Sequence, residues 1–432
     1  MQALTDTVDL PRLRRTLLHA GYAIGIGALV TAAAVGVIAQ VRPGGLAVTG
    51  VLAQSPLNLR ASIILHSASV ALVLTLLWTR LIAPVPAILR LRPMVKMTLG
   101  LCVLSPLLTM GANWCIVTGC TADHVALLPA LSMVATAVLY AIVMHPLSGT
   151  AGTSLGARLV LRSGYVWLLV TSVLQCAWIT SRVLLNDDRV LWFLERPTIE
   201  MGLLGFVAFS VIGVLMTNLE AVYHSRSLAQ ELMRSYQFAN GMIIAWGLME
   251  AWSLRYPASY QALAAALVGL TILITLTNIT MSSGLLSRRA LPGLSYSDSG
   301  TDGAWANGLA SASLAMMVVG AALIATTGVV AAASGAPPQP ELFASVLMAI
   351  GMGTLPLSAA AVMASMHRGL SACAGMGSIV VGAGALISLL LWSMDTLVDR
   401  PMAVFLAGAE GTIAIGLVIV LLCVLPMRLP AS

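Results

Sequence analysis

Charged residues are scarce in this chain of 432 residues, where Asp, Glu, Lys and Arg together make up only 9%. An ordinary soluble domain contains roughly 25% charged residues. So few charges cannot cover a water-exposed surface of normal size, which excludes a sizeable aqueous domain. Hydrophobic residues make up 59% of the chain. The composition therefore predicts a protein whose main solvent is lipid.

Cysteine is also scarce, with six residues in the whole chain. Six dispersed cysteines do not form the framework of a disulfide-rich secreted fold. Four of them lie inside apolar runs and are expected to pack as small hydrophobes: Cys102, Cys176, Cys373 and Cys423. Cys115 and Cys120 differ because they border a short connection predicted to face the oxidising side. We expect either a local disulfide there or two separate thiols.

Several catalytic signatures are missing from the sequence. There is no G-x-x-x-x-G-K-[ST] loop for a nucleotide, no H-E-x-x-H zinc helix and no C-x-x-C pair. These absences argue against transport driven by nucleotide hydrolysis within this chain. We expect a protein without catalytic activity.

Long hydrophobic runs are abundant, and each is long enough to cross about 30 Å of hydrocarbon as a helix. The predicted spans are Thr16 to Gln40, Asn58 to Ile82, Lys96 to Val117, Asp123 to Met144, Arg158 to Leu184, Thr198 to Glu220, Gln230 to Leu254, Ser259 to Met281, Ala304 to Ala333, Leu342 to Met366, Cys373 to Ser393 and Pro401 to Pro426. The sequence therefore predicts an all-α polytopic membrane protein. Its residues 1–432 are expected to form a single bundle of about 12 transmembrane helices.

The basic residues orient this bundle, because loops rich in Lys and Arg stay in the cytoplasm. Arg12, Arg14 and Arg15 precede the first span, and most other basic residues fall on the same side of the membrane. Both termini are therefore expected to be cytoplasmic. The first run lacks a signal-peptide cleavage site and is too long for a signal sequence, so we expect it to remain as a helix.

This topology also explains the net charge of +6, since scattered cytoplasmic arginines face anionic lipid. The expected partner is the lipid bilayer, and no nucleic acid is expected. The most suitable location is the inner (plasma) membrane of a bacterium.

Weak internal similarity suggests repeated units. The segment from Leu18 to Ile24, which opens the first span, resembles the segment from Leu161 to Trp167 in the fifth. A spacing of roughly 140 residues fits three units of four helices, at residues 16–144, 158–281 and 304–426. Two halves of six helices, as in many secondary transporters, are the alternative.

Two carboxylates in the spans are candidates for a substrate or proton site, because an ionisable group in a membrane span is costly and often functional. Glu410 is the deepest and lies between the small residues Gly408 and Gly411. Glu200 lies near the outer end of the sixth span. Glu410 could instead be a hydrogen-bonded carboxyl that ties two helices together.

Among the six histidines, only His66 lies well inside a predicted span. A buried histidine of this kind can bind a haem or a metal, or can form a hydrogen bond between helices. Met348, in the tenth span, lies at a comparable depth and is the second candidate haem contact.

The stretch from Arg162 to Leu169, followed by the stretch from Glu200 to Val214, resembles a helix pair of the NnrS family and of subunit I of haem-copper oxidases. In those families a Gly-Tyr-x-Trp helix precedes a helix of the form His-x-x-x-x-Gly-Phe-x-x-x-x-x-Ile-x-Gly. Their chains contain twelve helices in a pseudo-threefold arrangement. The resemblance covers about 55 residues.

The chain departs from these families at their metal ligands. Glu200 stands where the family motif has histidine, and the seventh and tenth spans contain no histidine. A dinuclear oxygen-reducing centre is therefore excluded. His66 corresponds loosely to a haem ligand in the second helix of those oxidases, and its usual partner is missing. The resemblance thus implies a non-catalytic protein that could associate with haem and act in nitric-oxide or respiratory stress.

Two further functions stay open. A secondary transporter would use Glu410 to take up a proton or cation. A scaffold subunit would pack its bundle against another membrane protein of a respiratory complex, or against another copy of itself.

Overall fold

The computed structural model describes the following residues: 23–34, 37, 85–117, 125, 127–148, 155–185, 198, 201–213, 229–251, 260, 262–267, 269–271, 273–274, 300–335, 357, 372–398 and 403–424. These residues form helices, and no strand occurs among them. The helices are α3 (Val85–Val117), α4 (Leu127–Ser148), α5 (Leu155–Leu185), the π-helix η2 (Gly202–Ala208), α8 (Ala229–Ala251), α10 (Gly300–Ser334), α12 (Ala372–Val398) and α13 (Ala403–Val424). Helical residues 23–34 and 262–274, the latter with gaps, complete the described part of the chain.

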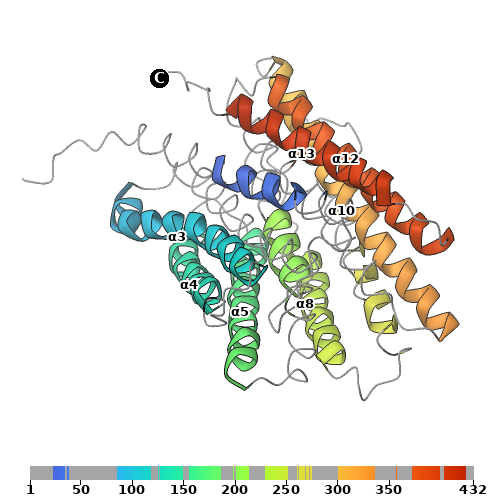
Figure 1. Cartoon of the computed structure of the whole chain (residues 1–432), viewed down its shortest axis with the longest axis horizontal. Helices are drawn as coiled ribbons and strands as arrows, with labels where there is room; N and C mark the ends of the chain where they lie inside the picture. Colours follow the sequence, from blue (N-terminus) through green and yellow to red (C-terminus); the bar gives the residue numbers. More distant parts are fainter. Residues whose placement is uncertain are drawn as a thin grey trace, which may run out of the picture.

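The helices gather in two groups (Figure 1). On one side α3 packs on α4, and α4 on α5; α5 also packs against η2 and α8. On the other side α12 packs on α13 and α10. Buried side chains from Ile26 to Val420 form one hydrophobic cluster that includes residues of both groups.

Within the described residues, four helices are long and apolar enough to cross a membrane: Leu127–Pro146, Arg158–Ser181, Ala312–Ser334 and Val404–Cys423. Each contains 20 to 24 residues, and 20 residues of helix extend about 30 Å. Only 39% to 50% of each span is buried inside the protein. Large exposed apolar side chains, such as Phe405 and Leu422, therefore face the surroundings, as expected for helices in lipid.

These helices confirm the prediction of a helical chain, and the four apolar spans are compatible with a membrane protein. The number of about 12 spans, the three repeats and the cytoplasmic termini stay predictions, because much of the chain lies outside the described residues.

Helices α3, α4, α10 and α12 each extend at least four residues beyond the predicted span. Helix α3 begins at Val85 rather than Lys96 and continues through Pro93 and Pro106. Helix α10 begins at Gly300, four residues before the predicted start at Ala304. In both places polar residues or prolines hid a helical extension beyond the apolar run, since a helix can continue past the membrane into water.

Threonines inside the helices satisfy their hydroxyl groups locally. Thr98, Thr109 and Thr136 each donate a hydrogen bond to the carbonyl oxygen four residues earlier, at 2.7 to 2.9 Å. In lipid no water is present to satisfy such groups, so this bond lets a polar side chain stay in a spanning helix. These threonines need no functional explanation.

Glycines hold two antiparallel helix pairs together with the same geometry. A Cβ atom added at Gly269 would lie 2.5 Å from the nitrogen of Ala325, and one added at Gly328 would lie 2.5 Å from the nitrogen of Ala266. These contacts join helix 262–274 to α10. The two backbones thus approach too closely for any side chain at either glycine.

The pair α12 and α13 repeats this arrangement. A Cβ atom at Gly416 would lie 2.8 Å from the nitrogen of Val381 and 2.9 Å from the oxygen of Gly377. One at Gly384 would lie 3.0 Å from the nitrogen of Ile413. In all four helices the glycine is the last of three contact residues spaced i, i+4 and i+7, which share one helix face.

Candidate functional site

Of the site residues predicted from the sequence, the structure places Glu410. His66, Glu200, Met348 and Cys120 lie outside the described residues, as do any contacts they make. Cys115 belongs to α3, but its side chain is not among those described. The predicted haem contacts and the predicted disulfide therefore stay predictions.

Glu410 is buried in α13, with 4% of its surface exposed. It is the seventh residue of the span Val404–Cys423, which puts it about 10 Å from the end of that span. Glu410 thus lies within an apolar helix, and its role as a substrate or proton site stays a prediction. Its neighbours Gly408 and Gly411 each have open space where a Cβ atom would lie.

The register of α12 against α13 determines which residues of α12 lie beside this carboxyl. Gly384 lies against the backbone of both Ala409 and Ile413. Ser388, one turn further along α12, has 2% of its surface exposed. Because the two helices are antiparallel, Ser388 lies within about one helical turn of Glu410 along the helix axes. Two buried polar residues, one from each helix, are thus brought to one level.

A second polar group connects α4, α5 and α8. We call His145, Ser163, Tyr165, Trp167 and Asn240 the hydrogen-bonded cluster. The indole nitrogen of Trp167 donates a hydrogen bond of 2.7 Å to the side-chain oxygen of Asn240. The hydroxyl of Ser163 donates to the same oxygen at 3.4 Å. Ser163 and Trp167 can share this acceptor because residues four apart lie on one face of a helix.

Tyr165 points to a different neighbour. Its hydroxyl lies 2.8 Å from Nδ1 of His145 in α4, and which atom donates depends on the histidine tautomer. Tyr165 is buried, with 9% of its surface exposed, whereas His145 is exposed. The pair thus links a buried hydroxyl to the surface at the end of α4.

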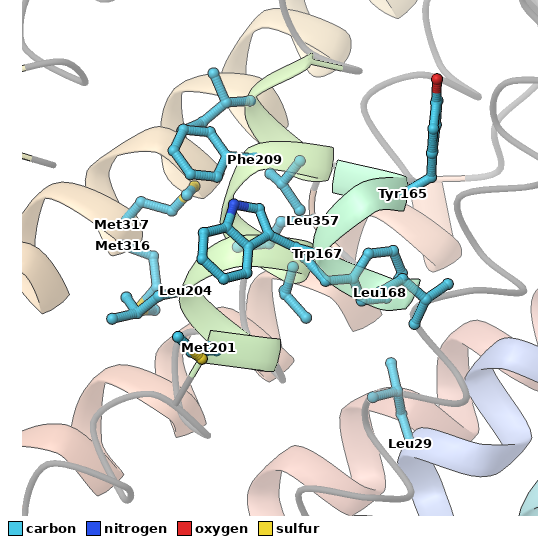
Figure 2. Close-up of a cluster of buried hydrophobic side chains, with 14 of the residues drawn as sticks. Leu29, Tyr165, Trp167, Leu168, Met201, Leu204, Phe209, Met316, Met317 and Leu357 are labelled. Carbon is cyan, nitrogen blue, oxygen red and sulfur yellow. The ribbon is translucent and has the colours of Figure 1, made fainter. Parts of the chain in front are cut away.

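The helix after α5 packs against the same segment through glycines. A Cβ atom at Gly205 would overlap the indole ring of Trp167, and one at Gly164 would overlap the hydroxyl of Ser210. A Cβ atom at Gly213 would lie 2.8 Å from Leu161. Figure 2 shows Trp167 among the buried side chains of Met201, Leu204 and Phe209, with Met316 and Met317 of α10 nearby.

This packing gives each residue of the Gly-Tyr-x-Trp stretch a structural role. Gly164 allows contact with Ser210, Tyr165 meets His145, and Trp167 meets Gly205 and Asn240. The π-helix η2 begins beside this contact, at Gly202. Such π-helical turns are rare in proteins as a whole, and those that occur often lie at functional sites. The residues that carry the family resemblance therefore come together as one packed unit.

Sequence reasoning missed Asn240 and the partner of His145. Asn240 is a polar residue within the predicted seventh span, and a polar residue in that position could have indicated a buried hydrogen bond. The pairing of His145 with Tyr165 had no signal, because partners in neighbouring helices are chosen by how those helices pack. No group of three His, Cys, Asp or Glu side chains suited to a metal occurs in the part of the chain that the structure describes.

Asn240→Leu is expected to destabilise the protein by about 1 to 3 kcal/mol, because the buried indole N–H of Trp167 loses its acceptor. Thermal unfolding in detergent, followed by tryptophan fluorescence, measures the effect. Gln237→Leu is the matched control, since Gln237 is exposed on the same helix. An equal loss of stability in both variants would contradict a role for this hydrogen bond.

The chain matches no known protein family, and no curated protein matches it.

Proposed function

We propose that this protein is a secondary transporter of the bacterial inner membrane in which Glu410 binds a proton or a small cation. The observation that carries the proposal is the burial of Glu410 within an apolar span of 20 residues. A carboxyl in that position is expensive to keep in a membrane and is usually retained for function. Binding a proton or cation compensates its charge, and this gives the site its chemistry.

The packing of α12 against α13 supports this function. Gly384 brings the two backbones together at the level of Glu410, and Gly416 does so further along α13, so the pair is suited to move as one rigid unit. Transporters commonly expose a fixed midplane site alternately to the two sides by rocking one group of helices against another. In this protein the group α10, α12 and α13 would move against the group α3, α4 and α5.

The experiment uses the full chain in liposomes loaded with a pH-sensitive dye. A pH gradient is imposed, and proton flux is recorded with sodium, potassium or lithium outside. We expect flux above that of empty liposomes, and its loss in Glu410→Gln, which keeps the shape of the side chain and removes its charge. Ser378→Ala is the control, because Ser378 is buried on α12 beside Gly377, in the part of the seam where Gly377 meets Gly416 and Val420. Equal flux in the wild type and in Glu410→Gln would contradict the proposal.

We also propose a haem-associated function of the NnrS and haem-copper type as the second candidate. The supporting observation is that the two stretches carrying the resemblance pack on each other through Gly164, Gly205 and Gly213. The described residues alone do not fit a haem, since His145 is the only histidine among them and is hydrogen-bonded to Tyr165. This candidate therefore depends on His66 and Met348.

Its test is the visible absorption spectrum of the purified protein, oxidised and reduced, after expression in a haem-replete host. A Soret band at about one haem per chain that disappears in His66→Ala would support this function. A colourless protein would exclude it and leave transport, or a scaffold role within a membrane complex, in its place.

A further inference from the structure

Among the described side chains of α3, the buried ones form one stripe, and half of them carry a hydroxyl group. Their positions alternate three and four residues apart, as expected for the face of a helix that packs along a neighbour. They are Val95, Thr98, Cys102, Ser105, Thr109 and Ala112. Because α3 packs on α4, this stripe lies in the contact between the two helices, which we call the α3–α4 seam.

A contact near the middle of the seam gives its register. Cys102 lies close enough to Tyr140 of α4 for the two side chains to interact electrostatically. The two helices are consecutive and are joined by the short segment 118–126, so they pack antiparallel. Starting from this contact, Ser105 lies three residues further along α3, and Thr136 lies four residues back along α4. Ser105 and Thr136 are therefore within about one helical turn of each other along the helix axes.

A second serine of the seam comes from α4. Ala130 packs in a small cluster with Trp178 and Ile179 of α5. Ser132 follows Ala130 by two residues, which puts it on the opposite flank of α4, toward α3. By the same count from the central contact, Ser132 lies at the level of Thr109 in α3. The seam thus contains two hydroxyl pairs, each made of one serine and one threonine from different helices.

The two serine hydroxyl groups have no hydrogen-bond partner among the described residues. Ser105 is fully buried, and Ser132 has 8% of its surface exposed and belongs to the span Leu127–Pro146. The threonines differ, because Thr109 donates to the carbonyl oxygen of Ser105 at 2.9 Å and Thr136 donates to that of Ser132 at 2.7 Å. A buried hydroxyl without a partner is costly, so each serine requires a group that the two helices do not supply.

We propose that water molecules bind in the α3–α4 seam and bridge Ser105 to Thr136 and Ser132 to Thr109. Buried waters typically bond to polar groups that are otherwise unsatisfied. A threonine hydroxyl that donates to a carbonyl can still accept a hydrogen bond from such a water. The residues named in the seam carry no carboxylate, amine or guanidinium, so its chemistry suits neutral water rather than an ion. This inference does not rest on the transport proposal.

The test is X-ray radiolysis of the full chain in detergent, in which a bound water yields hydroxyl radicals that oxidise the side chains beside it, followed by peptide mass spectrometry. Cys102 and Met133 are the reporters, because sulfur oxidises readily and their side chains are buried, with 0% and 1% exposed. Met317 of α10, with 2% exposed in the hydrophobic cluster, is the internal control. We expect more oxidation at both reporters than at Met317, and its loss in the variant Ser105→Ala with Ser132→Ala.

Two further measurements separate bound water from other causes. Thr98→Val removes a hydroxyl of the same stripe that is already bonded to the carbonyl oxygen of Met94 at 2.8 Å, so it is expected to leave the oxidation unchanged. A water-soluble maleimide is expected not to label Cys102. Labelling would overturn the proposal by showing that bulk water enters the seam. Oxidation of Met133 no greater than that of Met317, or equal oxidation in the double serine variant, would also overturn it and indicate serines bonded to their own helices.

Discussion

Gly416→Val is expected to force α12 and α13 apart and to destabilise the protein by about 3 kcal/mol. The reason is the backbone: a Cβ atom at this position would lie 2.8 Å from the nitrogen of Val381 and 2.9 Å from the oxygen of Gly377. Backbone atoms cannot rotate out of the way as a flexible side chain can. The helix pair that holds Glu410 at its level would therefore have to separate along its whole contact.

Unfolding of the purified protein by heat or by denaturing detergent measures this effect. Gly408→Val is a sharp control, because Gly408 lies on the same helix two turns away with open space where its Cβ would be. Both variants add the same side chain to α13 and change its helix propensity equally. A similar loss of stability in the two variants would show that close helix packing at Gly416 is not the cause.

Gly205→Leu is expected to have a second large effect, of about 3 kcal/mol, because the new side chain would occupy the space of the Trp167 ring. Displacing that ring also breaks the hydrogen bond from its N–H to Asn240. We therefore expect a shift in the tryptophan fluorescence spectrum together with a lower unfolding temperature. Both changes have one cause, so they should appear together.

Gly241→Leu separates this effect from a general intolerance of leucine near the cluster. Gly241 follows Asn240 in α8, is exposed, and has no atom within 4 Å of an added Cβ. It is expected to leave both the spectrum and the stability close to those of the wild type. A normal spectrum in Gly205→Leu would mean that α5 and the following helix can repack without moving Trp167.

The accuracy of each predicted helix boundary depends on the residues just outside the apolar run. Helix α13 was expected from Pro401 to Pro426 and runs from Ala403 to Val424, because prolines and polar residues bound its apolar run. Helix α3 was expected to begin at Lys96 and begins at Val85. Arg90, Arg92 and Pro93 made its first turns resemble a loop, although a helix that leaves the membrane can carry such residues.

The deep carboxyl was visible in the sequence because Glu410 is the only charged residue in its span. The position of Glu410 beside Ser388 was not visible in the sequence, because it depends on the antiparallel register of α12 and α13. The hydrogen-bonded cluster was hidden for the same reason: Ser163 and Asn240 are 77 residues apart, and their contact requires α5 and α8 to be neighbours.

The sequence by itself determined the helical character and the solvent of this protein. Apolar runs of about 20 residues with few charges satisfy every backbone hydrogen bond within one helix, which is the requirement lipid imposes. The tertiary structure alone decided which helices are partners. Only close packing selects Gly416 against Val381, Trp167 against Gly205 and Tyr165 against His145, because lipid offers no hydrophobic preference among apolar helix faces and leaves the choice to shape and hydrogen bonds.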